Sequence, residues 1–210
     1  HYPLRRQRQM CIRDRPMAVA VHAMRRFSIS KDSTVCVIGL GTIGLLLTMF
    51  LKSEGIENVY VFGNKDVQRD YARKLGIDDE CYNAKHISAD YVFECVGKNE
   101  TVNQTIELAA PAGHITMVGN PYSDMEISKD LYWKILRKQL KISGTWNSSY
   151  TGDVNDDWHF VLNKLEKAEI DPERFITHEY SIDGIQTGME IMRDKSEDYV
   201  KVICINEEDF

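Results

Sequence analysis

The 210-residue sequence lacks the cysteine spacing of a metal site or a disulfide scaffold. It contains no C-x-x-C pair and no histidine at the spacing of a tetrahedral zinc site. The cysteines are scattered along the chain at Cys11, Cys36, Cys81, Cys95 and Cys204. We therefore expect no zinc site built from this chain alone, and free thiols of the kind found in reduced, cytoplasmic proteins.

The sequence also lacks a long hydrophobic run and an excess of positive charge. Its longest apolar stretch, IGLLLTMFL, is about half a membrane span. The net charge of −6 makes nucleic acid and anionic membranes poor partners. An apolar fraction of 43% is ordinary for a globular protein. At roughly 150 residues per domain, the length favours one domain with an attached piece.

The first 15 residues differ from the rest of the chain. HYPLRRQRQMCIRDR is rich in arginine, has almost no apolar periodicity and lacks the apolar core of a secretory signal. QMCIRDR resembles the translation of a sequencing adapter left at the broken end of a gene. We interpret residues 1–15 as a non-native scar, and we expect the natural protein to continue upstream of Pro16.

A glycine motif follows the first apolar run. STVCVIG is typical of a strand buried on both faces, and it leads directly into GLGTIG and then into an apolar helix ending near Gly55. In such a motif Gly39 permits the tight turn, Gly41 lets the backbone approach a pyrophosphate, and Gly44 lets the helix pack against the strand. The helix N-terminus attracts the anion. A strand, helix and second strand surround the motif as a dinucleotide site requires.

Strands and helices continue to alternate. Strands are expected at ENVYVFG, CYN, DYVFECVG, GHITMVGN and LKISGTW, with helices at DVQRDYARKLG, NETVNQTIELA and KDLYWKILRKQ. This predicts an α/β fold, a doubly wound parallel six-stranded Rossmann sheet. The stretch AKHISA is too short for a crossover helix, so we expect a loop there.

Five separated motifs, PMAVAVHAMRR, VIGLGTIGLL, DYVFECVG, ITMVGNP and THEYSIDGIQTGMEIMRDKSEDYVKVICI, resemble the cofactor domain of medium-chain zinc-dependent alcohol and polyol dehydrogenases. They follow the family's order and cover the chain from Pro16 onward. KILRKQLKISGTWNSSY with DDWHFVLNKL is most similar to galactitol-1-phosphate 5-dehydrogenases, within the sorbitol dehydrogenase-like branch.

The resemblance implies an oxidoreductase that transfers a hydride between a zinc-bound polyol or polyol phosphate and a nicotinamide. In this family the catalytic zinc lies on a GroES-like domain, which these residues do not include. The resemblance thus implies a cofactor-binding domain at 16–168 and, at 169–210, a segment that returns to that domain. We expect RFITHEYS and VKVICI to expose apolar strand surface. A homodimer or tetramer is expected for the full-length enzyme, with LKISGTW as the dimer edge.

Cofactor-binding residues are carried over from the family position by position. The pyrophosphate turn matches Gly39, Gly41, Thr42, Ile43 and Gly44. The segment beside the adenosine matches Cys95, Val96 and Gly97, and the approach to the nicotinamide ribose matches Val118, Gly119 and Asn120. Thr145 and Trp146 fall near the carboxamide, and Lys201 matches a base that reaches the pyrophosphate. Cys95 could equally be a buried apolar residue and Lys201 a solvated charge. SEDYVKV, which contains Lys201, is interpreted as a solvated turn before the last strand.

The turn after the second strand indicates which nucleotide binds. NAD sites carry a carboxylate there that accepts hydrogen bonds from the adenosine ribose and repels a 2′-phosphate. This sequence has Gly63, Asn64 and Lys65, with Arg69 one helical turn later. Because the repulsive carboxylate is missing and donors are present, we predict NADP(H) in preference to NAD(H).

Two other functions are compatible with parts of the sequence. A non-catalytic NADPH-binding module or sensor would use the same glycine motif without turnover. A methyltransferase also has a glycine loop, but it too requires an acidic residue after the second strand, and ECVG and VGNP match it less well. The alcohol substrate cannot be read from these residues, because the groups that contact it lie mostly on the other domain of the family.

Overall fold

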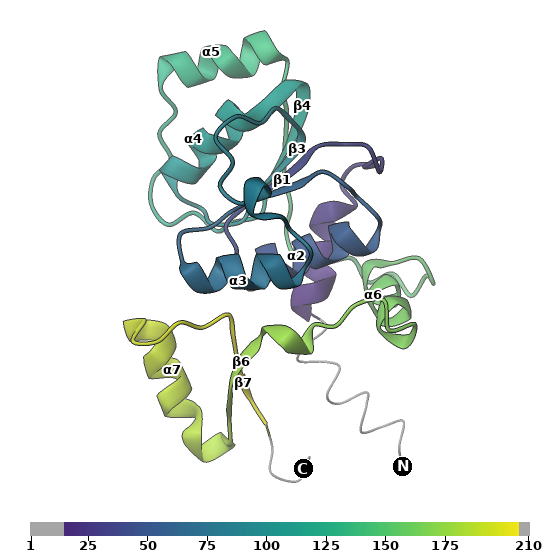
Figure 1. The fold of residues 1–210 in the computed structure, drawn as a ribbon, viewed down its shortest axis with the longest axis vertical. Coiled ribbons are helices and arrows are strands. Elements are labelled where there is room, and N and C mark those ends of the chain that lie inside the picture. Colours follow the sequence, from purple (N-terminus) through teal and green to yellow (C-terminus); the bar gives the residue numbers. More distant parts are fainter. Residues whose placement is uncertain (1–14, 206–210) are drawn as a thin grey trace.

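The computed structural model describes residues 15–205, which form two parallel sheets with helices around them (Figure 1). The larger sheet contains β1 (Val35–Ile38), β2 (Val59–Phe62), β3 (Ala89–Glu94), β4 (Ala109–Met117) and β5 (Lys141–Gly144). Its helices are the helical residues 15–24, α2 (Thr42–Ser53), α3 (Asp66–Lys74), α4 (Asn99–Leu108) and α5 (Lys129–Lys138). The smaller sheet contains β6 (Ile176–Tyr180) and β7 (Lys201–Cys204), accompanied by α6 (Asp157–Glu166) and α7 (Ile185–Asp194). Short 3-10 helices are η1 (Asp79–Cys81), η2 (Glu173–Phe175) and η3 (Ile182–Gly184).

The larger sheet is covered on both faces, as the uninterrupted apolar run of β1 predicts. Val35 and Val37 lie in one core, with residues of the helix at 15–24 and of α2 and α3. Cys36 and Ile38 lie in a second core, with residues of α4 and α5. Since successive side chains of a strand point to opposite faces, one strand supplies both cores. The predicted doubly wound parallel α/β fold is confirmed.

The strand order β2-β1-β3-β4-β5 places a topological switch point beside β1. From β1 the chain goes first to β2 on one side and then returns to β3 on the other, and all these pairings are parallel. In open parallel sheets, ligands bind beyond the carboxyl ends of the strands at such a point. The fold therefore directs attention to the turns that follow β1, β2, β3 and β4.

The sheet has five strands within the described residues, whereas the sequence predicted six. The expected strand at CYN is reduced to a single parallel bridge between Tyr82 and Val61. Cys81 belongs to η1 and Asn83 has φ +53°, so only Tyr82 is extended and able to pair. The loop predicted at AKHISA is confirmed, since no helix forms between η1 and β3.

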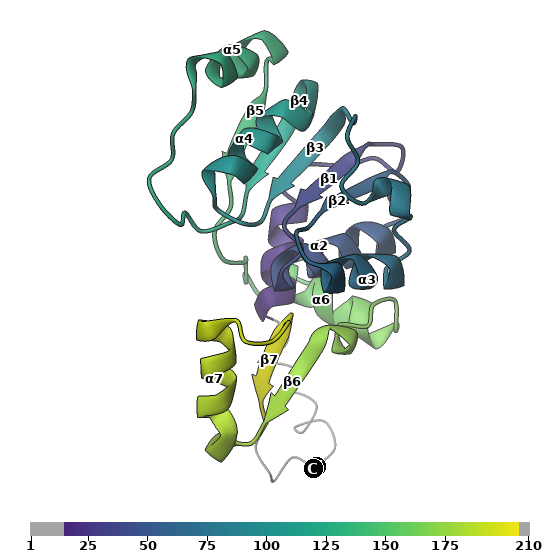
Figure 2. The same cartoon turned by 60° about the vertical axis from the view of Figure 1, so that its left-hand side comes forward.

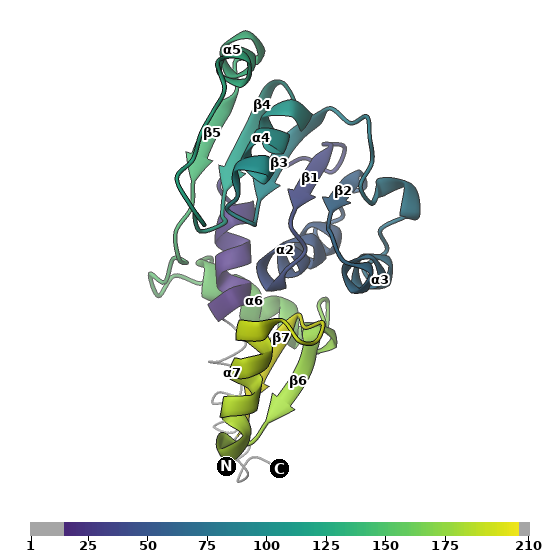
Figure 3. The ribbon, with the colours of Figure 1, turned by 90° about the vertical axis from the view of Figure 1, so that its left-hand side faces the viewer.

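The smaller sheet lies beyond the carboxyl ends of the main strands (Figure 2). Figure 3 shows α6 and the helical residues 15–24 at the junction between the two sheets. The exposed large apolar side chains of this part lie on η3 and α7: Ile182, Ile185, Met189 and Met192. Most residues of β6 and β7 are half-buried. The prediction that these strands expose apolar surface stays a prediction, since their residues are mostly half-buried and α7 contacts both strands.

No helix within residues 15–205 combines the length and the apolar character needed to span a bilayer. The scar interpretation concerns residues 1–15, of which all but Arg15 lie outside the described residues.

Candidate dinucleotide site

The turn between β1 and α2 is packed so tightly that it excludes side chains at two of its three motif glycines. Gly39 has φ +94°, and a Cβ added to it would lie 2.3 Å from Val96 Cγ2. A Cβ added to Gly44 would lie 1.8 Å from the carbonyl oxygen of Gly39. Gly39 also donates its N–H to the carbonyl of Phe62 over 2.8 Å, which holds the turn against the end of β2.

Gly41 differs from its neighbours because space lies beside it. A Cβ built on Gly41 would meet nothing within 4 Å. Gly41 is the N-cap of α2 and supplies no side-chain cap, so the first N–H groups of the helix remain available. The first turn of α2 contains no acidic residue. An anion at this position would meet free N–H groups and the positive end of the helix dipole.

Thr42 and Ile43 form the first turn of α2. Both are half-buried. The Thr42 hydroxyl donates to the carbonyl oxygen of Val200 over 2.5 Å. This bond joins the glycine turn to the segment that enters β7, and it connects the two sheets at the mouth of the candidate site.

The turns after β3 and β4 press against each other through backbone. Gly97 has φ +85°, and a Cβ there would lie 1.7 Å from the carbonyl oxygen of Asn120. A Cβ on Gly119 would lie 2.3 Å from the amide nitrogen of Gly97. The Val96 side chain fills the space into which a Cβ on Gly39 would point. Val118 donates its N–H to the carbonyl of Glu94 over 2.8 Å. The structure thus brings together three of the predicted turns, those after β1, β3 and β4.

Glu94 was not predicted as part of the site, yet its side chain organises the turn after β3. It is only 1% exposed, and its carboxylate accepts hydrogen bonds from the backbone N–H groups of Val96 and Gly97, each over 2.9 Å to Oε1. A carboxylate among buried apolar residues, directly before a glycine turn, is the signal in the sequence that could have revealed it. Beside it, burial and then the charge of Glu94 raise the pKa of the Cys95 thiol, so Cys95 remains a neutral thiol.

The turn after β2 is built from side chains. A Cβ on Gly63 would lie 2.6 Å from Gln68 Oε1 and 2.7 Å from the Tyr82 hydroxyl, both at the ends of side chains. Asn83 Oδ1 accepts from Gly63 N–H over 3.1 Å, and Gln68 Oε1 accepts from Asn64 N–H over 3.0 Å. Neutral groups therefore surround the position that a carboxylate occupies in NAD sites.

Both predicted cations of this turn already have acidic partners. Lys65 Nζ lies 2.8 Å from Asp198 Oδ1 and 5.9 Å from the centroid of the Tyr199 ring. Arg69 Nε lies 3.3 Å from Asp79 Oδ1, and its guanidinium lies over the ring of Tyr82, 5.5 Å from the centroid. Arg69 therefore points toward η1, whereas Lys65 points toward the segment before β7. The structure does not bring the two charges to one point.

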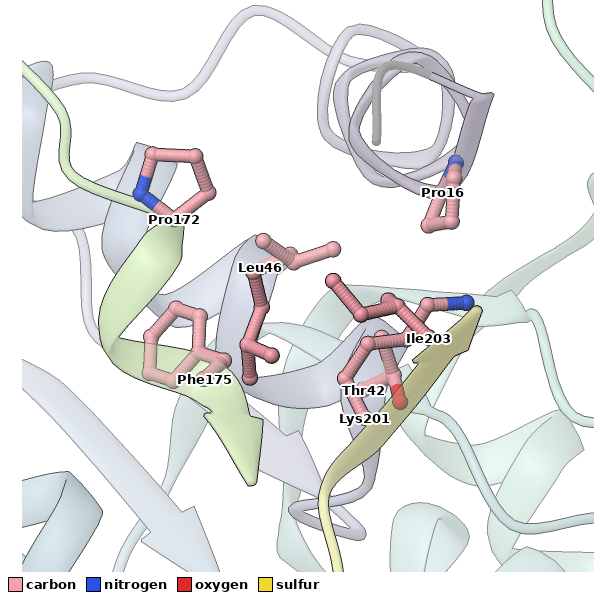
Figure 4. Close-up of a pocket in the computed structure, with 8 residues that line it drawn as sticks. Pro16, Thr42, Leu46, Pro172, Phe175, Lys201 and Ile203 are labelled. Carbon is pink, nitrogen blue, oxygen red and sulfur yellow. The ribbon is translucent and has the colours of Figure 1, made fainter. Parts of the chain in front are cut away.

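The remaining predicted residues follow β5 or begin β7. Thr145 follows β5, and its N–H donates to the carbonyl of Met117 over 3.1 Å, while its buried hydroxyl oxygen has no partner within residues 15–205. Trp146 is 74% exposed. Lys201 begins β7 and lines a small apolar pocket that also contains Thr42 (Figure 4). The other lining residues are Pro16, Leu46, Pro172, Phe175, Ile176 and Ile203.

The residues present fit a dinucleotide. The open cradle at Gly41 and the uncapped start of α2 offer N–H donors to a phosphate, and the Thr145 hydroxyl is a buried polar group without a partner among the described residues. The residues described do not fit a zinc ion, because no group of three or more His, Cys, Asp or Glu side chains among residues 15–205 could hold a metal.

A parallel sheet with a glycine cradle at its switch point defines a nucleotide-binding α/β protein of the Rossmann class. Residues 42–167 match the family model described as zinc-binding dehydrogenase, and the chain belongs to that family. It is an oxidoreductase family whose members bind nicotinamide dinucleotides. This confirms the family resemblance drawn from the five sequence motifs.

The similar proteins include polyol dehydrogenases and L-threonine 3-dehydrogenases, the latter up to 30% identical over 85% of this chain and 53% of their own. Galactitol 1-phosphate 5-dehydrogenase of Escherichia coli strain K12 is 24% identical over 80% of this chain and 52% of its own. Sorbitol dehydrogenase of Halalkalibacterium halodurans is 30% identical over 80% of this chain and 50% of its own. The chain spans about half the length of the curated relatives it matches.

Solved structures share the fold. An alcohol dehydrogenase from Escherichia coli CFT073, complexed with NADH, superposes with a TM-score of 0.79 at 22% identity, over 93% of this chain and 59% of its own. TarJ from Staphylococcus aureus, in complex with NADPH, superposes with a TM-score of 0.72 at 24% identity, over 90% and 61%. Both nicotinamide dinucleotides therefore occur on this fold.

Proposed function

We propose that this chain binds the nicotinamide cofactor of a polyol or polyol-phosphate dehydrogenase. When bound, the nicotinamide accepts or donates the hydride. The observation that carries the proposal is the cradle at Gly41: it is open on the ligand side and closed behind by the contact of Gly44 with Gly39. Gly41, Thr42 and Ile43 would present their N–H groups to the pyrophosphate, with Lys201 beside them.

The other predicted residues would bind the two ends of the dinucleotide. Cys95, Val96 and Gly97 would line the adenosine, and Val118, Gly119 and Asn120 the nicotinamide ribose. Thr145 would donate its hydroxyl to the carboxamide, which would give this buried oxygen the partner it lacks among the residues the structure describes. These residues would position and orient the cofactor and exclude water from it.

We propose NADP(H) in preference to NAD(H). The support is the neutral surrounding of Gly63 and the proximity of Lys65, which can donate to a 2′-phosphate. Arg69 contributes longer-range attraction, because its guanidinium is engaged by Asp79. Both cations form ion pairs, so a 2′-phosphate would compete with carboxylates for them.

Titration of the chain with NADPH and with NADH, followed by calorimetry, tests this proposal. We expect both to bind, and NADPH more tightly. Gly41→Ala should weaken both at least tenfold while changing stability by no more than about 1 kcal/mol, since the added methyl fills only the ligand space. The matched control is Gly144→Ala, because a Cβ there also meets nothing within 4 Å. Binding of neither cofactor, or equal binding by Gly41→Ala, would overturn the proposal; tighter NADH binding would overturn the choice of NADP.

The substrate class rests on the relatives alone. Some are named for galactitol 1-phosphate and sorbitol and others for L-threonine, and we propose a polyol or polyol phosphate. We propose further that zinc and the alcohol are bound by a domain outside this chain. Assays of the chain with NADP, zinc and either polyol should therefore show no turnover. Zinc-dependent turnover would contradict the proposal that zinc and the alcohol bind outside this chain, but it would not contradict cofactor binding by the chain.

The exposed edge of β5 is our proposed homodimer surface. Ile142 on β5 and Trp146 beyond it are exposed, and α5 adds Tyr132, Trp133 and Leu136. An uncovered apolar edge strand is a template for pairing with another chain. Sedimentation of wild type and Ile142→Lys should show a dimer only for wild type. A monomer in both cases would count against this edge.

A further inference from the structure

The segment Asp198–Val200 lies across two of the turns that form the candidate site. Its Val200 carbonyl accepts the Thr42 hydroxyl at the glycine turn, and its Asp198 carboxylate pairs with Lys65 at the turn after β2. Tyr199, between them, presents its ring to Lys65. Val200 is 5% exposed and donates its N–H to Thr177 Oγ1 over 3.2 Å, so the segment is attached to the smaller sheet.

Lys65 is expected to attract the 2′-phosphate of NADP(H), and Asp198, which pairs with it, would repel that phosphate. Lys65 is the N-cap residue of α3. It lies two residues after Gly63, the position at which NAD sites carry a carboxylate. Asp198 brings a carboxylate to the end of the Lys65 side chain from a distant part of the chain, while the surroundings of Gly63 itself stay neutral. A carboxylate here both holds the ammonium and repels a dianionic phosphate.

We propose that Asp198 is a specificity-determining residue: it competes with the 2′-phosphate of NADP(H) for Lys65 and so lowers the preference for NADP(H) over NAD(H). This rests on the proposed function. NADP(H) has to displace Asp198 from Lys65, whereas NAD(H), which carries no charge at that position, leaves the ion pair intact. The pair is partly exposed, with side-chain exposures of 35% for Lys65 and 56% for Asp198, so it can open without disrupting the core.

The test is the ratio of NADPH to NADH affinity in Asp198→Asn, measured by calorimetry on the chain. We expect NADPH to bind about three- to tenfold more tightly and NADH to change less than twofold, since an exposed pair is weak but the carboxylate also repels phosphate. The gain should shrink at high salt, which screens exposed charges. In the Lys65→Gln background, Asp198→Asn should give a smaller gain, because only the repulsion remains to be relieved.

The matched control is Asp194→Asn. Asp194 lies at the end of α7, near Asp198 in the sequence, and forms its own exposed ion pair with Arg193 over 2.7 Å. The Asp194→Asn substitution removes the same charge and a comparable ion pair, at a residue that does not contact Lys65. A gain confined to Asp198→Asn supports the proposal, and an equal gain in Asp194→Asn, or none in either, overturns it. If wild type binds neither cofactor, the proposed function itself fails, and that outcome is distinct from an unchanged ratio.

Amide hydrogen exchange of the wild-type chain gives a second test, because it detects displacement of the segment around Asp198 without any substitution. In wild type, NADPH should increase exchange in peptides covering residues 196–200 relative to NADH, because displacement of Asp198 frees that segment. Equal exchange with the two cofactors would contradict displacement.

Discussion

The turn after β1 and the turn after β2 are neighbours on the larger sheet, joined by the hydrogen bond from Gly39 to Phe62, yet they are built differently. The first consists of backbone packed on backbone, with an added Cβ on Gly44 only 1.8 Å from a carbonyl oxygen. The second consists of side chains, Gln68, Tyr82 and Asn83, and an exposed ion pair from Lys65.

This difference separates two tasks of a dinucleotide site. Pyrophosphate is common to all such cofactors, and a rigid backbone cradle serves it without selection between them. The adenosine ribose is where NAD and NADP differ, and there the contacts are side chains that can be exchanged. We expect changes in the first turn to act mainly on folding and on all cofactors, and changes in the second to act mainly on selectivity.

The largest effect is expected from Gly44→Ala. The new methyl would overlap the Gly39 carbonyl, a backbone atom that cannot rotate away, and should reduce the free energy of unfolding by about 3 kcal/mol or more. Urea denaturation measures this. Gly144→Ala, with open space around its Cβ, should stay within about 0.5 kcal/mol of wild type. Equal stability of the two variants would show that the cradle is less rigid than the structure indicates.

A smaller loss is expected from Glu94→Gln, which tests whether the turn after β3 shares the rigidity of the cradle. The amide oxygen can keep the two bonds to Oε1, but the NH₂ group in place of Oε2 would face the N–H of Gly97, and the charge that strengthens these bonds is lost, so we expect a loss of about 1–2 kcal/mol. Thermal and urea unfolding should show it, with weaker cofactor binding. Glu100→Gln, at an exposed position on α4, is the control and should change little. A neutral Glu94→Gln would mean that the buried carboxylate does not organise the turn.

Lys65→Asp tests the second turn. Loss of the ammonium and gain of a carboxylate should reverse the cofactor preference, with the NADPH to NADH affinity ratio falling at least about tenfold, equivalent to about 1.4 kcal/mol. Stability should change little at this partly exposed position. The control is Lys85→Asp in an exposed loop, which makes the same charge change elsewhere. An unaltered ratio in Lys65→Asp would rule out a role for Lys65 in selectivity.

The smallest effect is expected from Asp79→Asn, which probes the ion pairs behind the second turn. A hydrogen bond from Arg73, together with the charges of Arg69 and Arg73, lowers the pKa of Asp79 to about 2, against burial that raises it. Because the pKa is lower in the folded protein, the carboxylate stabilises the fold above its unfolded pKa of 3.8, and this is lost as the pH falls toward 2. The melting temperatures of wild type and Asp79→Asn should therefore differ slightly at pH 5 and converge near pH 2. In an Arg73→Gln background the difference should be reduced at every pH.

Much of the fold could be predicted from local patterns. The β-branched run before Gly39, the helix that follows and the N-cap at Ser128, whose hydroxyl accepts from Leu131 N–H, are local preferences that the structure retains. The sequence at CYN wrongly predicted a strand, because a strand forms only where several successive residues pair with a neighbour. Here only Tyr82 pairs, with Val61. The exposed apolar face of α7 was not predicted, because the sequence does not show which side of the helix packs on β6 and β7 and which side faces solvent.

The candidate site shows the same division. The glycine spacing identifies the cradle, since only glycine allows φ +94° at Gly39 and the close approach at Gly44. The roles assigned to the individual cofactor-binding residues stay predictions, as do the domain boundaries at 16–168 and 169–210. Asp198 was interpreted as part of a solvated turn. Its contact with Lys65 spans 133 positions, and no local pattern records such a separation.

The sequence by itself determined the class of this protein: the backbone conformations and close contacts of the glycine turn are local requirements that only glycine meets, and apolar periodicity specifies strands buried on both faces. The tertiary structure decided which charges meet at the nucleotide-selecting turn. Lys65 faces a carboxylate from the segment before β7, and Arg69 is drawn away to η1, because the packing of two sheets sets distances between residues that the chain order leaves open.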